Sequence, residues 1–265
     1  MLPYIHFIYL QLGPVKIHTW GFFVALGFLT ALILLIKKYP QKKEIFIDLC
    51  AYVLLGAIAG ARLFFLLFYS EEKLSLQNLF EIWEGGMSSM GGIFGGAIAA
   101  YLYARYKKMS FYGLAQKIAF VLPLGLAISR IGCFLINDHP GIKTIANPLS
   151  VNYPDGPRFD LGLLEMFFAA LIFGYFLILK KNYPSPHQSI SLIRRFLAKI
   201  WYGDGQKRRL FLENFLIIYG TGRFLLDFLR IDETKYAGLI PSQYATILLV
   251  IAGVYFYLKK QKFNN

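Results

Sequence analysis

Long apolar runs, separated by short polar segments, dominate the chain from end to end. Seven of these runs have about the 20 residues that an α-helix needs to cross the hydrocarbon core of a bilayer. They lie near residues 17–36, 45–69, 87–105, 117–137, 159–180, 210–229 and 239–258. The pattern predicts an all-α, polytopic membrane protein with seven transmembrane helices, in which residues 1–265 form a single integral membrane domain.

The distribution of basic residues predicts how these helices are oriented. Most of the 28 lysines and arginines lie after the first, third, fifth and seventh runs, and few lie in the alternate segments. By the positive-inside rule, the N-terminus is then outside and the C-terminus is cytoplasmic. Residues 190–200 alternate apolar and basic side chains at helical spacing, which indicates a short amphipathic helix on the anionic cytoplasmic surface.

The composition supports a membrane setting and argues against a nucleic-acid partner. Hydrophobic residues make up 57% of the chain and charged residues only 16%, which is unlike a soluble globular protein. The net charge of +13 would suit nucleic acid, but the basic residues lie in short connecting segments rather than along one groove. We therefore expect membrane lipid as a partner, and no nucleic acid.

Three arginines lie inside apolar runs, at Arg62, Arg130 and Arg223. A charge at such depth is costly and by default marks a functional site. Each lies about two turns before the outer end of its run, roughly 10 Å below the surface. This common depth predicts a pocket for an anionic ligand such as a phospholipid headgroup. Alternatively, each arginine pairs with an acid such as Glu165 or Asp227 and locks helices together. Asp227 is four residues from Arg223, which makes one such pair easy.

Glycines of the third run predict close helix packing and an anion site. Overlapping small residues at Gly91, Gly92, Gly95 and Gly96 let a neighbouring helix approach, and Gly56 and Gly60 do the same in the second run. Residues 85–92 (GGMSSMGG) also bracket a polar turn at the expected outer start of a helix. Backbone amides at a helix start suit an anion, so Gly91 and Gly92 are candidates for lipid binding.

Four sequence blocks together resemble one known family, the bacterial prolipoprotein diacylglyceryl transferases. The blocks are residues 13–21 (GPVKIHTWG), 85–92 (GGMSSMGG), 129–141 (SRIGCFLINDHPG) and 220–230 (GTGRFLLDFLR). The last three are similar to the family patterns GGMSxHGG, GRIGNFINGExxG and GxxRFxxExxR. They occur in the same order along almost the whole chain, and it is their combination that carries the resemblance.

The resemblance implies a reaction at the outer leaflet of the bacterial cytoplasmic (inner) membrane. Members of the family move a diacylglyceryl group from phosphatidylglycerol to the lipobox cysteine thiol in a prolipoprotein signal peptide, with no metal or nucleotide cofactor. Arg130 and Arg223 match functional arginines of the family, and a guanidinium suits bidentate contact with phosphate. Asp138 and Asp227 stand where the family has glutamates. The expected catalytic residues are Arg130, Arg223, Asp138 and His139, and the expected lipid-binding residues are Arg62, Arg130, Arg223, Arg230, Gly91 and Gly92.

Three positions depart from the family pattern. Its histidine in the second block is Met90 here, its asparagine after RIG is Cys133, and its tyrosine near the first helix is Trp20. In one interpretation the proton acceptor has moved to His139 or His18, since imidazole has a suitable pKa. In the other, the chain is a silent or re-purposed homologue that binds anionic phospholipid or lipoprotein without transfer. A small-solute transporter is a third class, disfavoured because the runs show no internal repeat.

Overall fold

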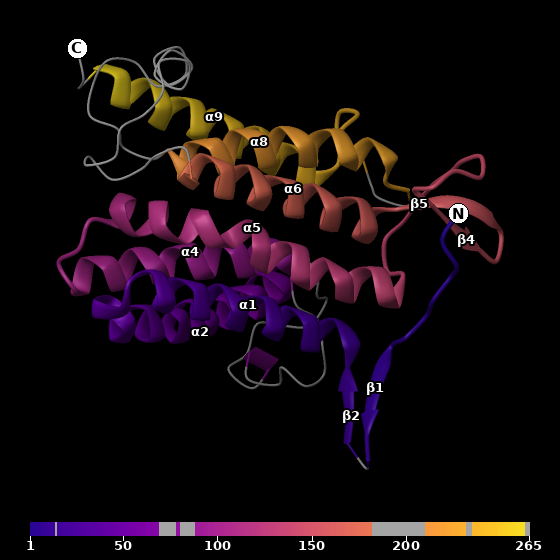
Figure 1. The fold of residues 1–265 in the computed structure, drawn as a ribbon, viewed down its shortest axis with the longest axis horizontal. Coiled ribbons are helices and arrows are strands. Elements are labelled where there is room, and N and C mark those ends of the chain that lie inside the picture. The colour runs from indigo at the N-terminus through magenta and orange to yellow at the C-terminus, as the bar shows by residue number, and fades with distance from the viewer. Residues whose placement is uncertain (14, 69–77, 80–87, 182–209, 232–234, 263–265) are drawn as a thin grey trace. The chain divides into compact units, whose positions relative to one another are not determined.

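The structure is a computed structural model that describes residues 1–13, 15–68, 78–79, 88–181, 210–231 and 235–262. Within these ranges the chain forms seven long helices (Figure 1), and each of them coincides with one of the predicted apolar runs. The helices are α1 (Thr19–Lys38), α2 (Lys43–Phe68), α4 (Ser89–Tyr106), α5 (Phe111–Ile136), α6 (Leu161–Lys181), α8 (Phe211–Leu226) and α9 (Pro241–Lys262). The predicted amphipathic helix near 190–200 and the first part of the glycine block, residues 85–87, lie outside the described ranges.

Among the described residues, five helices are long and apolar enough to cross a membrane. They are α1, α2 with the short 3-10 helix η1 (Pro40–Lys42) before it, α5, α6 and α9. Many of their large apolar side chains point outward, including Leu55, Leu171 and Leu248. A helix that is apolar on all sides belongs in lipid or in a large core, so this is a helical membrane protein. Helices α4, with 18 residues, and α8, with 16, are shorter and are not among these five.

The chain divides into two compact units. The second unit, Leu32–Lys117, is built on the pair α2 and α4. Small residues set their contact, as the sequence predicted: a Cβ added to Gly56 would lie 2.7 Å from the carbonyl oxygen of Gly95. A Cβ on Gly60 would lie 2.8 Å from the Cα of Gly95. Such close approach of two backbones is possible only where side chains are missing.

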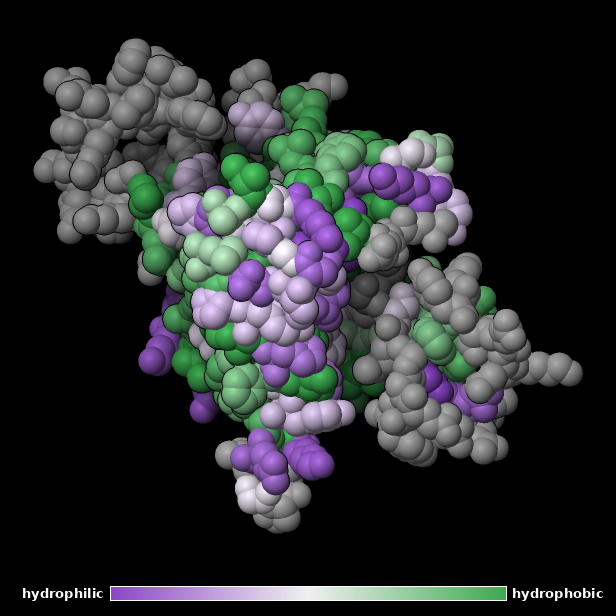
Figure 2. All heavy atoms as spheres, turned by 90° about the vertical axis from the view of Figure 1, so that its right-hand side faces the viewer, coloured by the Kyte–Doolittle hydropathy of each residue, from purple (hydrophilic) through white to green (hydrophobic). Residues whose placement is uncertain are grey.

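The first unit, Met1–Ala31 with Ile118–Asn265, holds the start of α1, most of α5, and α6, α8 and α9. It also holds two small antiparallel sheets that the sequence did not predict. The first pairs β1 (Tyr9–Leu12) with β2 (Val15–His18), and the second has the order β3-β5-β4. Its strands are β3 (Pro140–Lys143), β4 (Ser150–Tyr153) and β5 (Gly156–Asp160). Polar side chains gather on the end of this unit that carries the second sheet (Figure 2).

The second sheet fixes the start of α6. Val151 and Tyr153 of β4 pack with Leu163 of α6 in one buried cluster. Asp160, the last residue of β5, accepts a hydrogen bond from the backbone N–H of Leu163 at 2.8 Å and therefore caps the helix. The Tyr153 hydroxyl donates to the other oxygen of Asp160 at 2.6 Å. The position of α6 along its axis is thus set by the sheet.

Candidate active site: a buried cluster of arginines and carboxylates

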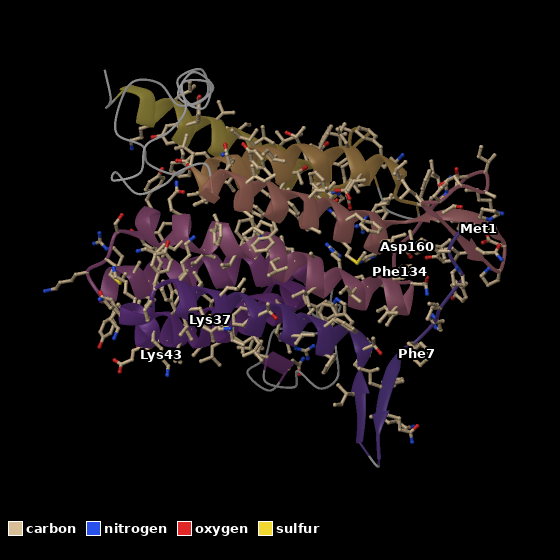
Figure 3. The ribbon with its side chains drawn as sticks, in the orientation of Figure 1. Met1, Phe7, Lys37, Lys43, Phe134 and Asp160 are labelled. Atoms are coloured by element: carbon tan, nitrogen blue, oxygen red, sulfur yellow. The ribbon has the colours of Figure 1, made fainter. Side chains whose placement is uncertain are left out.

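Two close helix contacts bring the site together in the first unit. Gly162, at the start of α6, lies so near α5 that an added Cβ would be 2.7 Å from the backbone nitrogen of Phe134. Figure 3 shows Phe134 and Asp160 near each other where α5 ends and α6 begins. On α8, Gly222 leaves room for the ring of Phe168 from α6, which would otherwise collide with a Cβ. Both contacts depend on glycine.

Three arginines converge on Glu165, which lies one turn into α6 and is 3% exposed. Arg130 of α5 places its Nε 2.7 Å from Glu165 Oε2. Arg223 of α8 pairs with Glu165 Oε1 through Nη1, and Arg230 places Nη2 3.7 Å from the same oxygen. All three contacts are ion pairs between a guanidinium group and the carboxylate. The carboxylate therefore holds three helix ends together mainly by charge.

Asp227 forms the second half of the cluster. It begins the 3-10 helix η3 (Asp227–Leu229) directly after α8 and is buried. Its Oδ1 lies 3.2 Å from Arg223 Nη2 and 3.3 Å from Arg230 Nε. Its Oδ2 accepts a hydrogen bond from the Ser242 hydroxyl of α9 at 2.8 Å. The buried part of the site thus combines three guanidinium groups with two carboxylates, which leaves one positive charge in excess.

Asp138 and His139 lie at the more open edge of the cluster, just after α5. The Asp138 side chain is 35% exposed and the His139 side chain 28%, and their Oδ2 and Nε2 atoms are 3.6 Å apart. Burial, and then the charges of Arg230, Arg130 and Arg223, lower the pKa of His139 to about 3. Burial raises the pKa of Asp138, while Arg130 and Arg230 act in the opposite direction. His139 is therefore a neutral imidazole at physiological pH.

Cys133 joins this edge to the arginines. It is buried one turn after Arg130 on α5, and its Sγ accepts a hydrogen bond from Arg130 Nη1 at 3.4 Å. Trp20 of α1 lies beside this turn of α5. The backbone of Trp20 also packs on Gly132, where a Cβ would lie 3.0 Å from its Cα. Two of the three departures from the family pattern, Trp20 and Cys133, are therefore neighbours.

Five of the eight predicted site residues lie together in the first unit, and the other three lie in the second unit. Arg130, Arg223, Arg230, Asp138 and His139 all lie in the first unit around Glu165. Arg62, Gly91 and Gly92 belong to the second unit, so their place in a shared pocket stays a prediction. Within that unit the buried Arg62 donates from Nε to the carbonyl oxygen of Asn78 at 2.8 Å.

The amides of the glycine block already have partners within the second unit. The Gly91 N–H donates to the Ser88 hydroxyl at 3.4 Å and the Gly92 N–H donates to the Ser88 carbonyl at 3.0 Å. Ser88 is thus the N-cap of α4. A Cβ on Gly91 would meet the backbone of Gly60, so this glycine is also needed for packing.

The sequence offered Glu165 as an acid that could pair with a buried arginine but did not place it at the centre of the site. Nothing local to residue 165 indicates that three arginines from α5, α8 and the segment after η3 converge there. Ser242 was missed entirely, because a serine in the first turn of a helix is usually only a helix-start signal. Its contact with Asp227 depends on the packing of α9 against α8.

These features define the class of protein. It is an integral membrane protein of apolar helices, with a polar, arginine-rich site buried at one end of them. Comparison with known proteins gives the family. The family model for prolipoprotein diacylglyceryl transferase matches residues 7–259. The chain is 31% identical to the phosphatidylglycerol–prolipoprotein diacylglyceryl transferases of Francisella tularensis subspecies tularensis, mediasiatica and novicida, over 99% of this chain and 98% of each relative. The chain belongs to the prolipoprotein diacylglyceryl transferase family.

Proposed function

We propose that the chain transfers a diacylglyceryl group from phosphatidylglycerol to the lipobox cysteine thiol of a prolipoprotein. The observation that carries this proposal is the cluster of Arg130, Arg223 and Arg230 around Glu165. Its buried part has one positive charge in excess, and a phosphodiester has one negative charge. Guanidinium groups held in place by carboxylates bind phosphate oxygens in a fixed geometry.

In the proposed reaction, the acceptor sulfur attacks the glyceryl carbon that bears the phosphate. A C–S bond forms, the C–O bond breaks, and its electron pair stays with the phosphate oxygen of the departing glycerol phosphate. Arg130 and Arg223 would neutralise the charge that develops on this oxygen, which is the usual role of preorganised cations at a leaving group. Asp138 would orient the acceptor or the glycerol at the open edge. His139 was the predicted proton acceptor, but its pKa of about 3 makes it too weak a base for a thiol, so the thiol proton would leave to water at this edge.

The setting of the reaction is part of the proposal. The charge distribution supports seven spans, an outside N-terminus and a cytoplasmic C-terminus in the bacterial inner membrane. With that orientation the ends of α5, α6 and α8 that carry the cluster face the outside. Phosphatidylglycerol in the outer leaflet and a secreted signal peptide would both reach the site from that side.

The test is complementation of a transferase-depleted bacterium, combined with mass measurement of a reporter lipoprotein. We expect the reporter to gain the mass of a diacylglyceryl group, and Arg130→Ala and Arg223→Ala to abolish the gain. Arg105→Ala, at an exposed position of α4, is a matched control that should retain it. A well-expressed protein that adds no diacylglyceryl mass would reject the transferase and favour a silent homologue.

A further inference from the structure

Residues 2–8 form an extended arm that links the second sheet, the end of α5 and the start of α1, all within the first unit. Figure 1 shows this arm running from beside β4 towards β1. The Leu2 N–H donates to a carbonyl oxygen of β4 at 2.8 Å, and the Phe7 N–H donates to the Leu135 carbonyl oxygen at 2.8 Å. The Ile8 carbonyl oxygen accepts from the first N–H of α1 at 2.9 Å. The arm is therefore held at three places.

In its middle, the arm uses the backbone groups of one edge. The side-chain amide of Asn137, just after α5, donates to the Ile5 carbonyl oxygen, so Ile5 and Phe7 both turn backbone groups toward the end of α5. Neighbouring residues of an extended chain turn these groups to opposite sides. Among the described residues, the backbone N–H and C=O groups of Tyr4 and His6 have no partner. Their rings stack at 5.9 Å, as side chains two positions apart do on one face of a strand. The exposed residues Tyr4 and His6 thus present a free strand edge.

We propose that the acceptor peptide docks as an extended strand on this free edge. The inference rests on the proposed transferase function, because it names how the protein substrate of that function is held. An exposed strand edge is a template for pairing with another chain, and several classes of protein bind extended peptides in this way. Backbone hydrogen bonds do not depend on side chains, so such an edge holds acceptors that differ in sequence around the cysteine.

The place of the arm fits this occupant. Asn137, which binds the arm at Ile5, directly precedes Asp138 at the open edge of the arginine cluster. A strand paired with the free edge would lie about two strand spacings, roughly 10 Å, from Asn137. About three extended residues, at roughly 3.3 Å each, cover that distance. A cysteine about three positions beyond the paired segment therefore reaches the site.

The side chains along the arm also fit a peptide better than a phosphate. Residues 1–12 contain no lysine, arginine, aspartate or glutamate. Phe7 and Tyr9 are each 56% exposed and Ile8 is 39% exposed, which gives apolar contacts for the apolar residues of a signal peptide. The arm thus offers backbone groups and apolar side chains, while the charges that suit a lipid phosphate lie in the arginine cluster.

The test measures how tightly a synthetic peptide binds the full-length protein in detergent. The peptide spans the acceptor position of a reporter prolipoprotein, with serine in place of the cysteine so that no transfer occurs. A series of such peptides carries one backbone N-methyl group each, at successive positions. Methylation removes an N–H that a paired strand needs. We expect Kd to rise about 10-fold at every second position, beginning about three residues from the acceptor, and to stay within about two-fold between them.

Two variants at one position assign this alternation to the arm. His6→Pro removes the outward N–H, so it should raise the Kd of the unmethylated peptide about 10-fold and flatten the alternation. His6→Ala is the matched control, because it keeps that N–H and removes only the ring. It should keep both the affinity and the alternation, and the melting temperature of each variant identifies it as folded. Equal losses in the two variants would assign the contact to the imidazole and overturn the docking edge.

Other results would also decide the question. A peptide that does not bind, or that responds equally to methylation at every position, would overturn the docking edge. A dimer of the natural sequence that His6→Pro converts to monomers would do the same, since a second copy would then occupy the edge. Alternation without diacylglyceryl transfer in the complementation test would refute the proposed function and leave the docking edge. Transfer without alternation would leave the function and refute the edge.

Discussion

Glu165 is the shared ion-pair partner of Arg130, Arg223 and Arg230. Breaking a buried ion pair by removing one partner typically costs about 3–5 kcal/mol, because the other charge is left uncompensated. Here one carboxylate compensates parts of three guanidinium groups, and Asp227 compensates two of the same three. The cluster therefore both joins helices and keeps one positive charge in excess. In the proposed function, helix locking and anion binding, which the sequence offered as alternatives, would be properties of the same residues.

Arg223→Lys tests whether geometry at this cluster matters beyond charge. Arg223 reaches Glu165 and Asp227 with different nitrogens of one planar group, and a lysine ammonium cannot do both. We expect transferase activity to fall at least about 10-fold, which corresponds to about 1.4 kcal/mol of transition-state stabilisation. Arg105→Lys on the exposed face of α4 should stay within about two-fold of the natural sequence. Equal activity of both variants, measured with a reporter peptide, would show that charge alone suffices at position 223.

Local residue patterns predicted part of this site. The spacing of Arg223 and Asp227 indicated their pair, which the structure confirms at 3.2 Å. The depth of Arg130 predicted a buried charge, and Glu165 was one of the acids offered as a partner for the arginines. The pair itself could not be assigned, because Glu165 comes from a helix 35 positions later along the chain. The charge of Arg230 was expected near the lipid, yet its contact with both carboxylates depends on the turn of η3. Contacts between helices are set by packing and leave no local signal.

At the scale of the elements, apolar length predicted the helices well and the sheets not at all. Strands β1, β2, β3 and β4 have four residues each and β5 has five, too few for an alternating pattern to stand out. They nevertheless position the site, because β4 and β5 fix the first turn of α6 and so the place of Glu165. Short polar connections between spans can therefore carry structure that hydropathy does not reveal.

The cap of α6 should make stability depend on pH. Burial raises the pKa of Asp160 to about 6, against an ordinary value near 4. The folded protein then keeps a proton that the unfolded chain has released, so this stability is present below about pH 4 and is lost as pH rises through 6. We expect the melting temperature in detergent to fall between pH 5 and 7.5, and to fall less in Asp160→Asn.

Asp155→Asn is the control for this prediction. Asp155 is an exposed acid between β4 and β5, and its ion pair with Arg158 lowers its pKa, so it stays charged at both pH values. The variant should keep the same fall in melting temperature as the natural sequence. If Asp160→Asn and the natural sequence give parallel curves, the carboxyl group of Asp160 is not the group that titrates.

The contact between α2 and α4 gives a second prediction at this scale. An added Cβ at Gly60 would lie 2.8 Å from Gly95 Cα, a backbone atom that cannot rotate away. Gly60→Ala should therefore destabilise the second unit by about 1–3 kcal/mol, as overpacking does in other cores. Gly174→Ala in α6, where a Cβ meets nothing within 4 Å, should be neutral or slightly stabilising. Thermal unfolding in one detergent compares the two, and similar melting temperatures would contradict the packing argument.

For the whole molecule, the orientation of the helices decides whether the proposed site faces its substrates. The argument rests on charge: basic residues crowd the segments after the first, third, fifth and seventh apolar runs. Position 146, in the connection between β3 and β4, should then be outside, and position 107, after α4, should be cytoplasmic. In a Cys50→Ala, Cys133→Ala background, Ala146→Cys should react with a membrane-impermeant maleimide in intact spheroplasts. Lys107→Cys should react only after the membrane is permeabilised, and the opposite pattern would place the arginine cluster at the cytoplasmic face, away from secreted lipoproteins.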